Sequence, residues 1–131
     1  MMTDPLADFL TRIKNGYMAH KEKIDVSHSK VKESLAKLLS EQGYVGKVDV
    51  SKIDKTKSVI SIQLLYQNRK PKVEEIIKVS KPGRRTYVNK KSIPKVLSGL
   101  GICVISTPLG LMTGKQAAQK GLGGELICKM W

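Results

Sequence analysis

Residues 102–131, ICVISTPLGLMTGKQAAQKGLGGELICKMW, alternate between apolar runs and short polar breaks. The run ICVIS predicts a strand, TPLG a turn, LM a short second strand, and GELICKMW a last strand. Between LM and the last strand, Thr113 is placed to cap a small helix. This stretch is therefore expected to form a small sheet with one short helix.

The residues just before this stretch continue the same pattern. VEEIIKVS, the loop KPGRR and TYV predict strands around a Pro-Gly turn. SIPKVLSGLG predicts a short helix that starts at Ser92 and ends at its glycines. Residues 73–131 are thus expected to be a mostly β C-terminal lobe with short helices. The stretch 67–72, QNRKPK, has no apolar residue and is expected to be the linker.

Residues 1–66 alternate between helical and strand patterns. Asp4 is placed to cap a helix that begins at Pro5 and ends near Asn15-Gly16 or just beyond. Ser29 caps a second helix, which Gly43 stops. KIDVS, YVGKVDV and SVISIQLLY read as three strands. The expected fold class is α+β, with an N-terminal α/β lobe of two helices on a three-stranded sheet.

The composition indicates a soluble protein. The chain has 131 residues, 40% of them apolar, which suffices for one compact domain or two small lobes that share a core. It contains no apolar stretch long enough to cross a membrane. Its start, MMTDPLADFL, carries two acidic residues where a signal peptide has basic ones. We therefore expect a protein that is neither exported nor inserted in a membrane.

Positive charge is concentrated in the second half of the chain. There are 24 Lys and Arg against 11 Asp and Glu, a net charge of +13. Residues 1–66 carry a net charge of +3 and residues 67–131 a net charge of +10. A polyanion is the natural partner, because each neutralised phosphate releases counterions. An anionic membrane is the rival partner, but no segment has the form of a basic amphipathic helix.

The sequence offers no metal or redox site. Cys103 and Cys128 each lie in an apolar strand-like run, without a C-x-x-C motif, and are expected to be buried thiols. His20 and His28 have no zinc-like spacing and are expected to be surface or helix-end residues.

Two nucleotide-binding patterns fail on inspection. In GLMTGKQ, three residues separate Gly110 from Gly114 where a phosphate loop has four, and Gln116 follows Lys115 in place of Ser or Thr. The glycines of GLGICV precede a strand and do not follow one, so this is no dinucleotide-binding turn. No cofactor is therefore expected.

Ser106 and Thr107 leave two functional classes open. As nucleophiles on a phosphorylated substrate they would need a deep pocket and a base close to Ser106. As RNA-binding hydroxyls at a hairpin tip they would contact the 2′-OH and phosphates, and Tyr87 could stack on a base. Basic clusters with few acids between them favour the second class. These clusters are Arg69, Lys70 and Lys72; Lys78 and Lys81; Arg84 and Arg85; Lys90, Lys91 and Lys95; and Lys115 and Lys120.

The run VISTPLGLMTGKQAAQKGLGGELIC closely resembles the signature of the eighth protein of the small ribosomal subunit, in its bacterial or organellar form. MTDPLADFLTRIKNG and VSKPGRRTYV also resemble that family, so the resemblance covers essentially the whole chain. It implies the two-lobe fold described above. It also implies primary binding to the central domain of small-subunit (16S) ribosomal RNA, where the protein helps assemble the platform.

The resemblance also implies which residues contact RNA. In the second lobe these are Ser106, Thr107, Gly123, Gly124 and Glu125, flanked by Tyr87, Arg84, Arg85 and Lys115. In the first lobe, a second patch comprises Thr3, Asn15 and Lys30.

Two departures from the family pattern lie in the signature. Pro108 replaces a third hydroxyl, so one hydrogen bond to RNA is expected to be absent. Gly114 replaces an Asp that can cap the small helix, which leaves Thr113 to cap it alone.

The remaining implications concern partners and place. The family resemblance implies neighbouring small-subunit proteins, among them proteins five and twelve, and a monomer when free. It implies a place in the ribosome, in the cytoplasm or in the matrix or stroma of an organelle. The same surface is also a candidate translational repressor, through a messenger RNA that mimics the ribosomal site.

Overall fold

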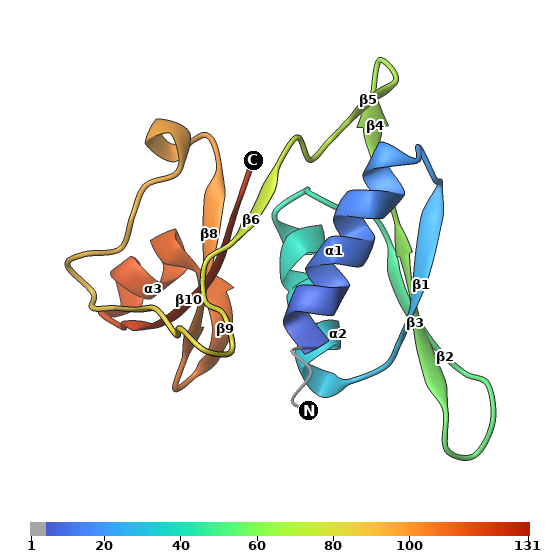
Figure 1. Ribbon diagram of the computed structural model, residues 1–131, viewed down its shortest axis with the longest axis horizontal. Helices are drawn as coiled ribbons and strands as arrows, with labels where there is room; N and C mark the ends of the chain where they lie inside the picture. Colours follow the sequence, from blue (N-terminus) through green and yellow to red (C-terminus); the bar gives the residue numbers. More distant parts are fainter. Residues whose placement is uncertain (1–4) are drawn as a thin grey trace. The chain divides into compact units, whose positions relative to one another are not determined.

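A computed structural model describes residues 5–131, which form two compact units, Pro5–Val73 and Glu74–Trp131. The first unit contains two helices and a three-stranded sheet, and the second is mostly β (Figure 1). The expected α+β class and its order along the chain are therefore confirmed.

The first unit is built on an antiparallel sheet with the strand order β1-β3-β2. Its elements are α1 (Pro5–Met18), β1 (Lys23–Ser27), α2 (Lys30–Glu41), β2 (Val48–Lys52) and β3 (Ser58–Gln63). Both helices cover the same face of the sheet (Figure 1). Because side chains alternate along a strand, Ile24 and Val26 of β1 point into the core while their neighbours are exposed.

The ends of α2 form as the sequence predicts. The Ser29 side chain accepts a hydrogen bond from the backbone N–H of Lys32 at 3.2 Å, which satisfies one of the free donors at the helix start. Gln42 closes the helix, and Gly43 follows it with φ +81°, a conformation that favours glycine. The cap expected at Asp4 lies outside the described residues.

A hairpin stands where a linker was expected. β4 (Tyr66–Gln67) and β5 (Lys70–Pro71) pair in antiparallel fashion, with Tyr66 opposite Pro71 and Gln67 opposite Lys70. Residues 67–72 therefore belong to the first unit, which ends at Val73. Polar composition alone does not separate an exposed two-residue turn from a linker, because both lack apolar residues.

The second unit is a sheet with the path β6-β10-β8-β9, and β7 also pairs with β10. Its strands are β6 (Ile76–Lys78), β7 (Tyr87–Val88), β8 (Ile102–Thr107), β9 (Gly110–Thr113) and β10 (Gly124–Met130). The helix α3 (Gly114–Lys120) contributes to a hydrophobic core with β8, β9 and β10. The buried members of this core are Val96, Cys103, Ile105, Met112, Ala117 and Leu126.

The prediction of a helix that begins at Ser92 is wrong. Only a short 3-10 turn η1 (Leu97–Gly99) forms in this segment, and Ser98 within it has a positive φ of 55°. The backbone N–H of Ser92 donates to the Asn89 side chain at 3.0 Å, and the Ser92 hydroxyl accepts from the Asn89 N–H at 3.2 Å. Ser92 thus closes a turn with Asn89, which competes with its use as a helix cap.

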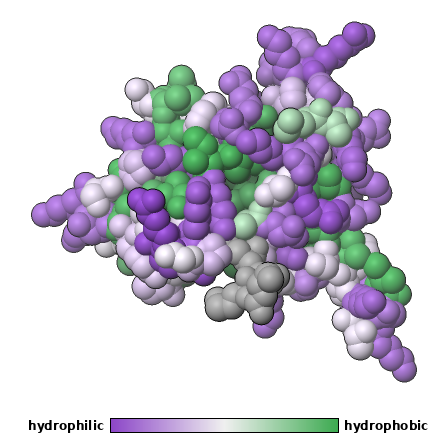
Figure 2. Space-filling view, in the orientation of Figure 1, coloured by the Kyte–Doolittle hydropathy of each residue, from purple (hydrophilic) through white to green (hydrophobic). Residues whose placement is uncertain are grey.

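The face of the molecule seen in Figure 2 is largely polar. Hydrophilic residues cover much of the visible face, with hydrophobic groups scattered among them (Figure 2). Within residues 5–131, no helix is long and apolar enough to cross a membrane.

Candidate nucleic-acid interface

Three predicted contact residues line up across three neighbouring strands of the second unit. Glu125 of β10 pairs with Ser106 of β8 on one side and with Tyr87 of β7 on the other. Paired residues of antiparallel strands point to the same face of a sheet. We call Ser106, Glu125 and Tyr87 the three-strand row. The Tyr87 side chain is 70% exposed, so its ring is open to a stacking partner.

Two glycines let these strands approach closely. A Cβ on Gly124 would lie 2.1 Å from the carbonyl oxygen of Ser106. A Cβ on Gly123 would lie 2.5 Å from the carbonyl oxygen of Val88. Contacts this short involve backbone atoms, which cannot swing aside as a side chain can. The two glycines therefore have a structural role, because they allow the strands of the row to lie close together.

The Glu125 carboxylate is held by two donors of the same unit. Ser80 Oγ donates to Glu125 Oε2 at 2.5 Å, and Arg85 Nη1 donates to the same oxygen at 3.2 Å. Ser80 Oγ in turn accepts from the backbone N–H of Thr86 at 3.1 Å. One carboxylate oxygen thus ties the loop between Ser80 and Thr86 to β10.

Ser80 is a part of the site that sequence reasoning missed. It is 1% exposed, and its hydroxyl links Glu125 to the backbone of Thr86. The sequence shows only a small polar residue at the end of an apolar run, which is also common at ordinary strand ends. No pattern in the sequence pairs Ser80 with a carboxylate 45 residues away.

The predicted basic loop is a tight turn. Lys81 and Arg84 exchange backbone hydrogen bonds of 3.1 and 2.9 Å around Pro82-Gly83. The side chain of Arg85 is 37% exposed while it pairs with Glu125. Arg84 therefore lies at the end of a hydrogen-bonded turn, and Arg85 lies between this turn and Tyr87 of the row.

Only one of the two adjacent hydroxyls is presented. Thr107 is 8% exposed; its hydroxyl donates to the Gly110 carbonyl at 2.8 Å and accepts from the Leu109 N–H at 3.2 Å. The expectation that both hydroxyls are exposed is therefore wrong for Thr107. Side chains alternate along β8, so Ser106 faces the row while Thr107 closes the β8–β9 turn.

The start of α3 is more fully capped than expected. Thr113 accepts from the Gln116 N–H at 3.1 Å, and the Gln116 side chain accepts from the Thr113 N–H at 3.0 Å. Thr113 therefore does not cap the helix alone. Lys115 is exposed in the first turn of α3, as an RNA contact requires. Gly114 leaves room for a neighbouring side chain, because a Cβ there would lie 2.4 Å from Cys103 Sγ.

The two described residues of the expected first-lobe patch lie on different helices. Asn15 is exposed in the last turns of α1, whereas Lys30 is exposed at the first residue of α2. Strand β1 separates these helix ends, which lie toward opposite ends of the sheet (Figure 1). Thr3 lies outside the described residues.

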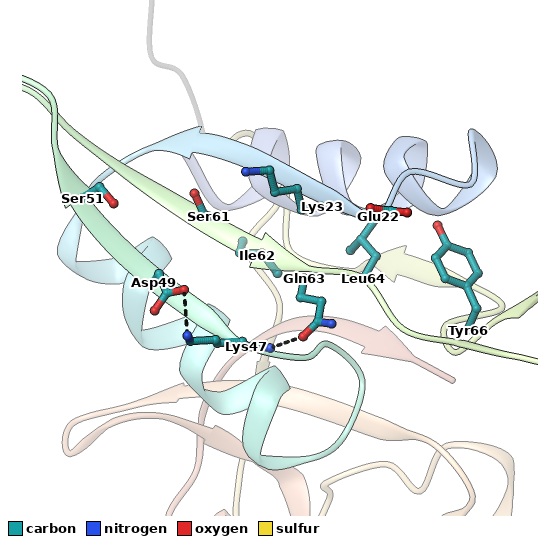
Figure 3. Close-up of a pocket in the computed structure, with 10 residues that line it drawn as sticks. All are labelled: Glu22, Lys23, Lys47, Asp49, Ser51, Ser61, Ile62, Gln63, Leu64 and Tyr66. Carbon is teal, nitrogen blue, oxygen red and sulfur yellow. Dashed lines mark hydrogen bonds and ion pairs between the residues drawn. The ribbon is translucent and has the colours of Figure 1, made fainter.

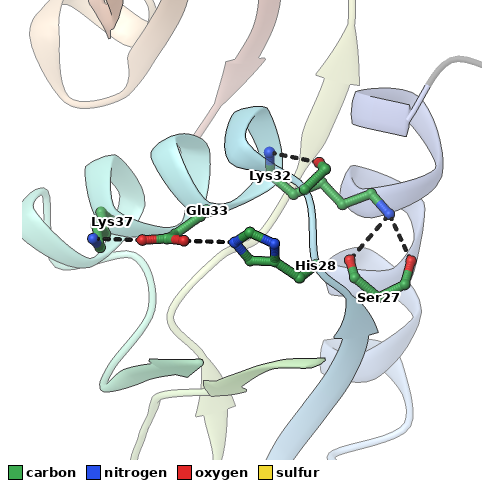
Figure 4. A network of polar contacts seen from close by, with 6 residues as sticks. Ser27, His28, Lys32, Glu33 and Lys37 are labelled. Atoms are coloured by element: carbon green, nitrogen blue, oxygen red, sulfur yellow. Dashed lines mark hydrogen bonds and ion pairs between the residues drawn. The ribbon is translucent and has the colours of Figure 1, made fainter. Parts of the chain in front are cut away.

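A polar network surrounds the start of α2 near Lys30 (Figure 4). His28 Nε2 and Glu33 Oε1 are 2.7 Å apart, and Lys37 Nζ lies 2.6 Å from Glu33 Oε2. The hydrogen bonds from Lys37 and then His28 hold the pKa of the Glu33 carboxyl below its ordinary value. His28 is thus a helix-end residue, as expected.

The enzymatic alternative requires a deep pocket and a base near Ser106. A pocket of about 590 Å³ lies in the first unit, along the strands β1, β3 and β2 (Figure 3). Its lining includes Lys23, Asp49 and Tyr66, and neither Ser106 nor Thr107 belongs to it. Within residues 5–131, no group of three His, Cys, Asp or Glu side chains could hold a metal ion.

Comparison with known proteins gives a consistent result over the full length. The family model described as Ribosomal protein S8 matches residues 4–131. Three similar relatives are each named Small ribosomal subunit protein uS8. The Syntrophomonas wolfei protein is 50% identical over 132 residues, covering 100% of this chain and 99% of the relative. The Syntrophus aciditrophicus and Dictyoglomus turgidum proteins are 47% and 46% identical, each over 99% of this chain and 98% of the relative.

The matched residues include both units and every element of the three-strand row. Gly123, Gly124, Glu125 and Ser106 thus lie within the matched residues. This chain belongs to the ribosomal protein S8 family.

Proposed function

We propose that this chain is a structural constituent of the small ribosomal subunit and that its second unit binds small-subunit ribosomal RNA. The relatives that share its full length carry the name of a small-subunit protein. The observation that supports RNA binding most strongly is the three-strand row of Ser106, Glu125 and Tyr87, with a basic loop tied to it. Membership of a family of ribosomal proteins confirms that the chain is not an enzyme.

Each group of the row has a distinct task in this proposal. The Tyr87 ring stacks on an unpaired base, and the Ser106 hydroxyl exchanges hydrogen bonds with the sugar edge. Arg84 and Arg85 bind phosphates from the tight turn. Glu125 uses Oε2 for Ser80 and Arg85, which leaves Oε1 to accept from a base amino group.

The finer assignment follows the family resemblance. The RNA site is the central domain of the small-subunit RNA, and binding there helps assemble the platform. Proteins five and twelve of the small subunit are the proposed neighbours within the ribosome, and the free protein is a monomer. A messenger RNA that copies the ribosomal site would occupy the same row, so translational repression requires no second surface.

The test is a titration with a central-domain transcript and with an unrelated RNA duplex of the same length. The transcript is expected to bind at least a hundredfold more tightly than the duplex. Between about 50 and 200 mM salt, affinity for both is expected to fall on the order of a hundredfold or more, because several phosphates are neutralised. Equal affinity for the two RNAs would contradict the proposed function.

A further inference from the structure

The β4–β5 hairpin has a backbone geometry that its sequence does not favour. Asn68 and Arg69 form its two-residue turn with φ of 53° and 65°, both positive. A two-residue turn of this kind is type I′, whose preferred sequence is Asn-Gly. Asn68 matches the first position, but Arg69 occupies the position where glycine avoids strain.

Nothing within the described chain accounts for an arginine at this position. Residues 67–70 are exposed, and none of the side chains of Arg69, Lys70 and Lys72 has a hydrogen-bond or ion-pair partner among residues 5–131. The segment from Tyr66 to Val73 holds these three cations and no acidic residue. Backbone strain is concentrated at functional sites, so a strained residue without an internal partner is a reason to look for an external one.

The base of the hairpin is firmly attached to the end of α1. The Tyr66 ring stacks on His20 with centroids 5.5 Å apart, and its hydroxyl donates to the Lys21 carbonyl at 2.6 Å. Tyr17 meets the Tyr66 ring edge-on, with centroids 5.6 Å apart. The turn is therefore presented from a fixed support, which lowers the entropy lost when it binds.

We propose that the β4–β5 hairpin is a second RNA contact, in which Arg69 binds the phosphate backbone without reading sequence. This inference rests on the proposed function, because it takes RNA as the partner. A guanidinium suits phosphate through its paired donors, and neighbouring Lys70 and Lys72 extend the cationic surface. The strain at Arg69 costs stability, which the phosphate contact offsets when RNA is bound.

Substitutions at Arg69 separate its charge from its backbone strain. Arg69→Gln removes the charge but keeps a non-glycine residue at positive φ, Arg69→Gly removes both, and Arg69→Lys keeps a cation. The matched control is Lys55→Gln, which removes an exposed cation from the turn between β2 and β3 of the same unit. Lys55 does not have a positive φ. Each variant is titrated with the central-domain transcript and the unrelated duplex, and its thermal midpoint is measured.

Arg69→Gln and Arg69→Gly are expected to weaken binding to both RNAs by the same factor. The loss is roughly five- to tenfold at about 0.1 M salt, and the salt slope falls by about one. Arg69→Lys is expected to bind with an affinity between those of the wild type and Arg69→Gln, because it keeps the charge and loses the paired donors. Lys55→Gln is expected to stay within about twofold of the wild type, because it removes a cation that lies outside the hairpin. Arg69→Gly raises Tm by about 2–4 °C, and Arg69→Gln leaves Tm unchanged.

If Arg69→Gln kept the affinity and salt slope of the wild type, the inference would be overturned. The same result is expected if the hairpin binds an acidic protein and not RNA. An equal loss in Lys55→Gln would also overturn it, because the hairpin would then be no different from any exposed cation. A lower Tm in Arg69→Gly would contradict the claim that the backbone of Arg69 is strained. Failure of the wild type to prefer the transcript refutes the proposed function instead, and is visible in the same titration.

Discussion

The three-strand row and the β4–β5 hairpin present polar groups to a partner in opposite ways. In the row, the register of β7, β10 and β8 fixes Tyr87, Glu125 and Ser106 relative to one another. At the hairpin, a strained turn carries an exposed cation on a long side chain. Fixed short groups can discriminate between RNA surfaces, whereas a mobile cation attracts any phosphate backbone. Under the two proposals above, we expect the row to give specificity and the hairpin to give sequence-independent affinity.

The largest expected effect breaks the row at its closest contact. Gly124→Ala would place a Cβ 2.1 Å from the Ser106 carbonyl oxygen, so β8 and β10 must separate. We expect a loss of roughly 3 kcal/mol in the free energy of unfolding, at the upper end for overpacking, and loss of preference for the transcript. Denaturant unfolding and RNA titration measure the two effects.

Gly43→Ala is the matched control for this substitution. Gly43 has φ +81° but open space around it, so alanine meets backbone strain without a clash. The expected cost is roughly 1–2 kcal/mol, with the preference for the transcript intact. Equal costs at both glycines would show that the close approach of β8 and β10 does not hold the row.

The second-largest expected effect concerns the hydrogen bonds by which Ser80 holds Glu125. Ser80→Ala removes the donor to Glu125 and the acceptor for the Thr86 N–H. Loss of a buried hydrogen-bonding group costs roughly 1–3 kcal/mol. We expect affinity for the transcript to fall about tenfold while affinity for the unrelated duplex changes little, because the loop keeps its charge. Ser80→Thr, which keeps the hydroxyl, should recover part of the preference.

The fold was largely predictable because its signals are local. Alternation places β1, an apolar run places β10, and the hydroxyls of Ser29 and Thr113 mark the starts of α2 and α3. The failure at Ser92 has the same local origin, since a hydroxyl beside Asn89 serves a turn as well as a helix. The prediction that Ser106 and Thr107 are both exposed failed for a different reason. Side chains of neighbouring residues in β8 point to opposite faces of the sheet, and the prediction ignored this alternation.

The membership of the candidate site stays a prediction, and its arrangement could not be predicted from the sequence. The family signature placed Ser106, Gly124 and Glu125 in one surface, and strand pairing brings them together. The role of Ser80 depends on a contact 45 residues away in sequence, which no local pattern encodes. The strain at Arg69 requires the backbone angle, because composition shows only another basic residue.

A smaller effect separates the two adjacent hydroxyls of β8. Ser106→Ala should weaken binding to the transcript by roughly 1 kcal/mol and leave unfolding unchanged. Thr107→Val should lower the free energy of unfolding by roughly 1–2 kcal/mol, because it removes two hydrogen bonds of the turn. Calorimetric unfolding and RNA titration of both variants check this. The opposite pattern would mean that Thr107 is the presented hydroxyl.

The smallest effect concerns the two cysteines of the second unit. Cys103 and Cys128 are free and buried. Burial raises the pKa of Cys103, and burial with the nearby Cys103 thiol raises the pKa of Cys128 to about 12. Both thiols should therefore react slowly with iodoacetamide at neutral pH, with and without RNA.

The raised pKa of the Cys128 thiol makes the stability of the fold depend on pH. Below the ordinary thiol pKa of 9.0, folded and unfolded Cys128 are both protonated, so its contribution is fully present. Between pH 9.0 and about 12 only the unfolded thiol ionises, so stability falls as pH rises. Cys128→Ala should show a shallower alkaline decline in unfolding experiments. Rapid labelling of both thiols in the native protein would contradict the burial of these two side chains.

The division of tasks between the row and the hairpin is tested most directly by one ratio. The affinity for the central-domain transcript divided by that for the unrelated duplex is measured for the wild type, Ser106→Ala and Arg69→Gln. We expect Ser106→Ala to lower the ratio about fivefold, because one net hydrogen bond of roughly 1 kcal/mol is lost only with the transcript. Arg69→Gln should lower both affinities and leave the ratio unchanged. A ratio that falls in Arg69→Gln and holds in Ser106→Ala would contradict the account.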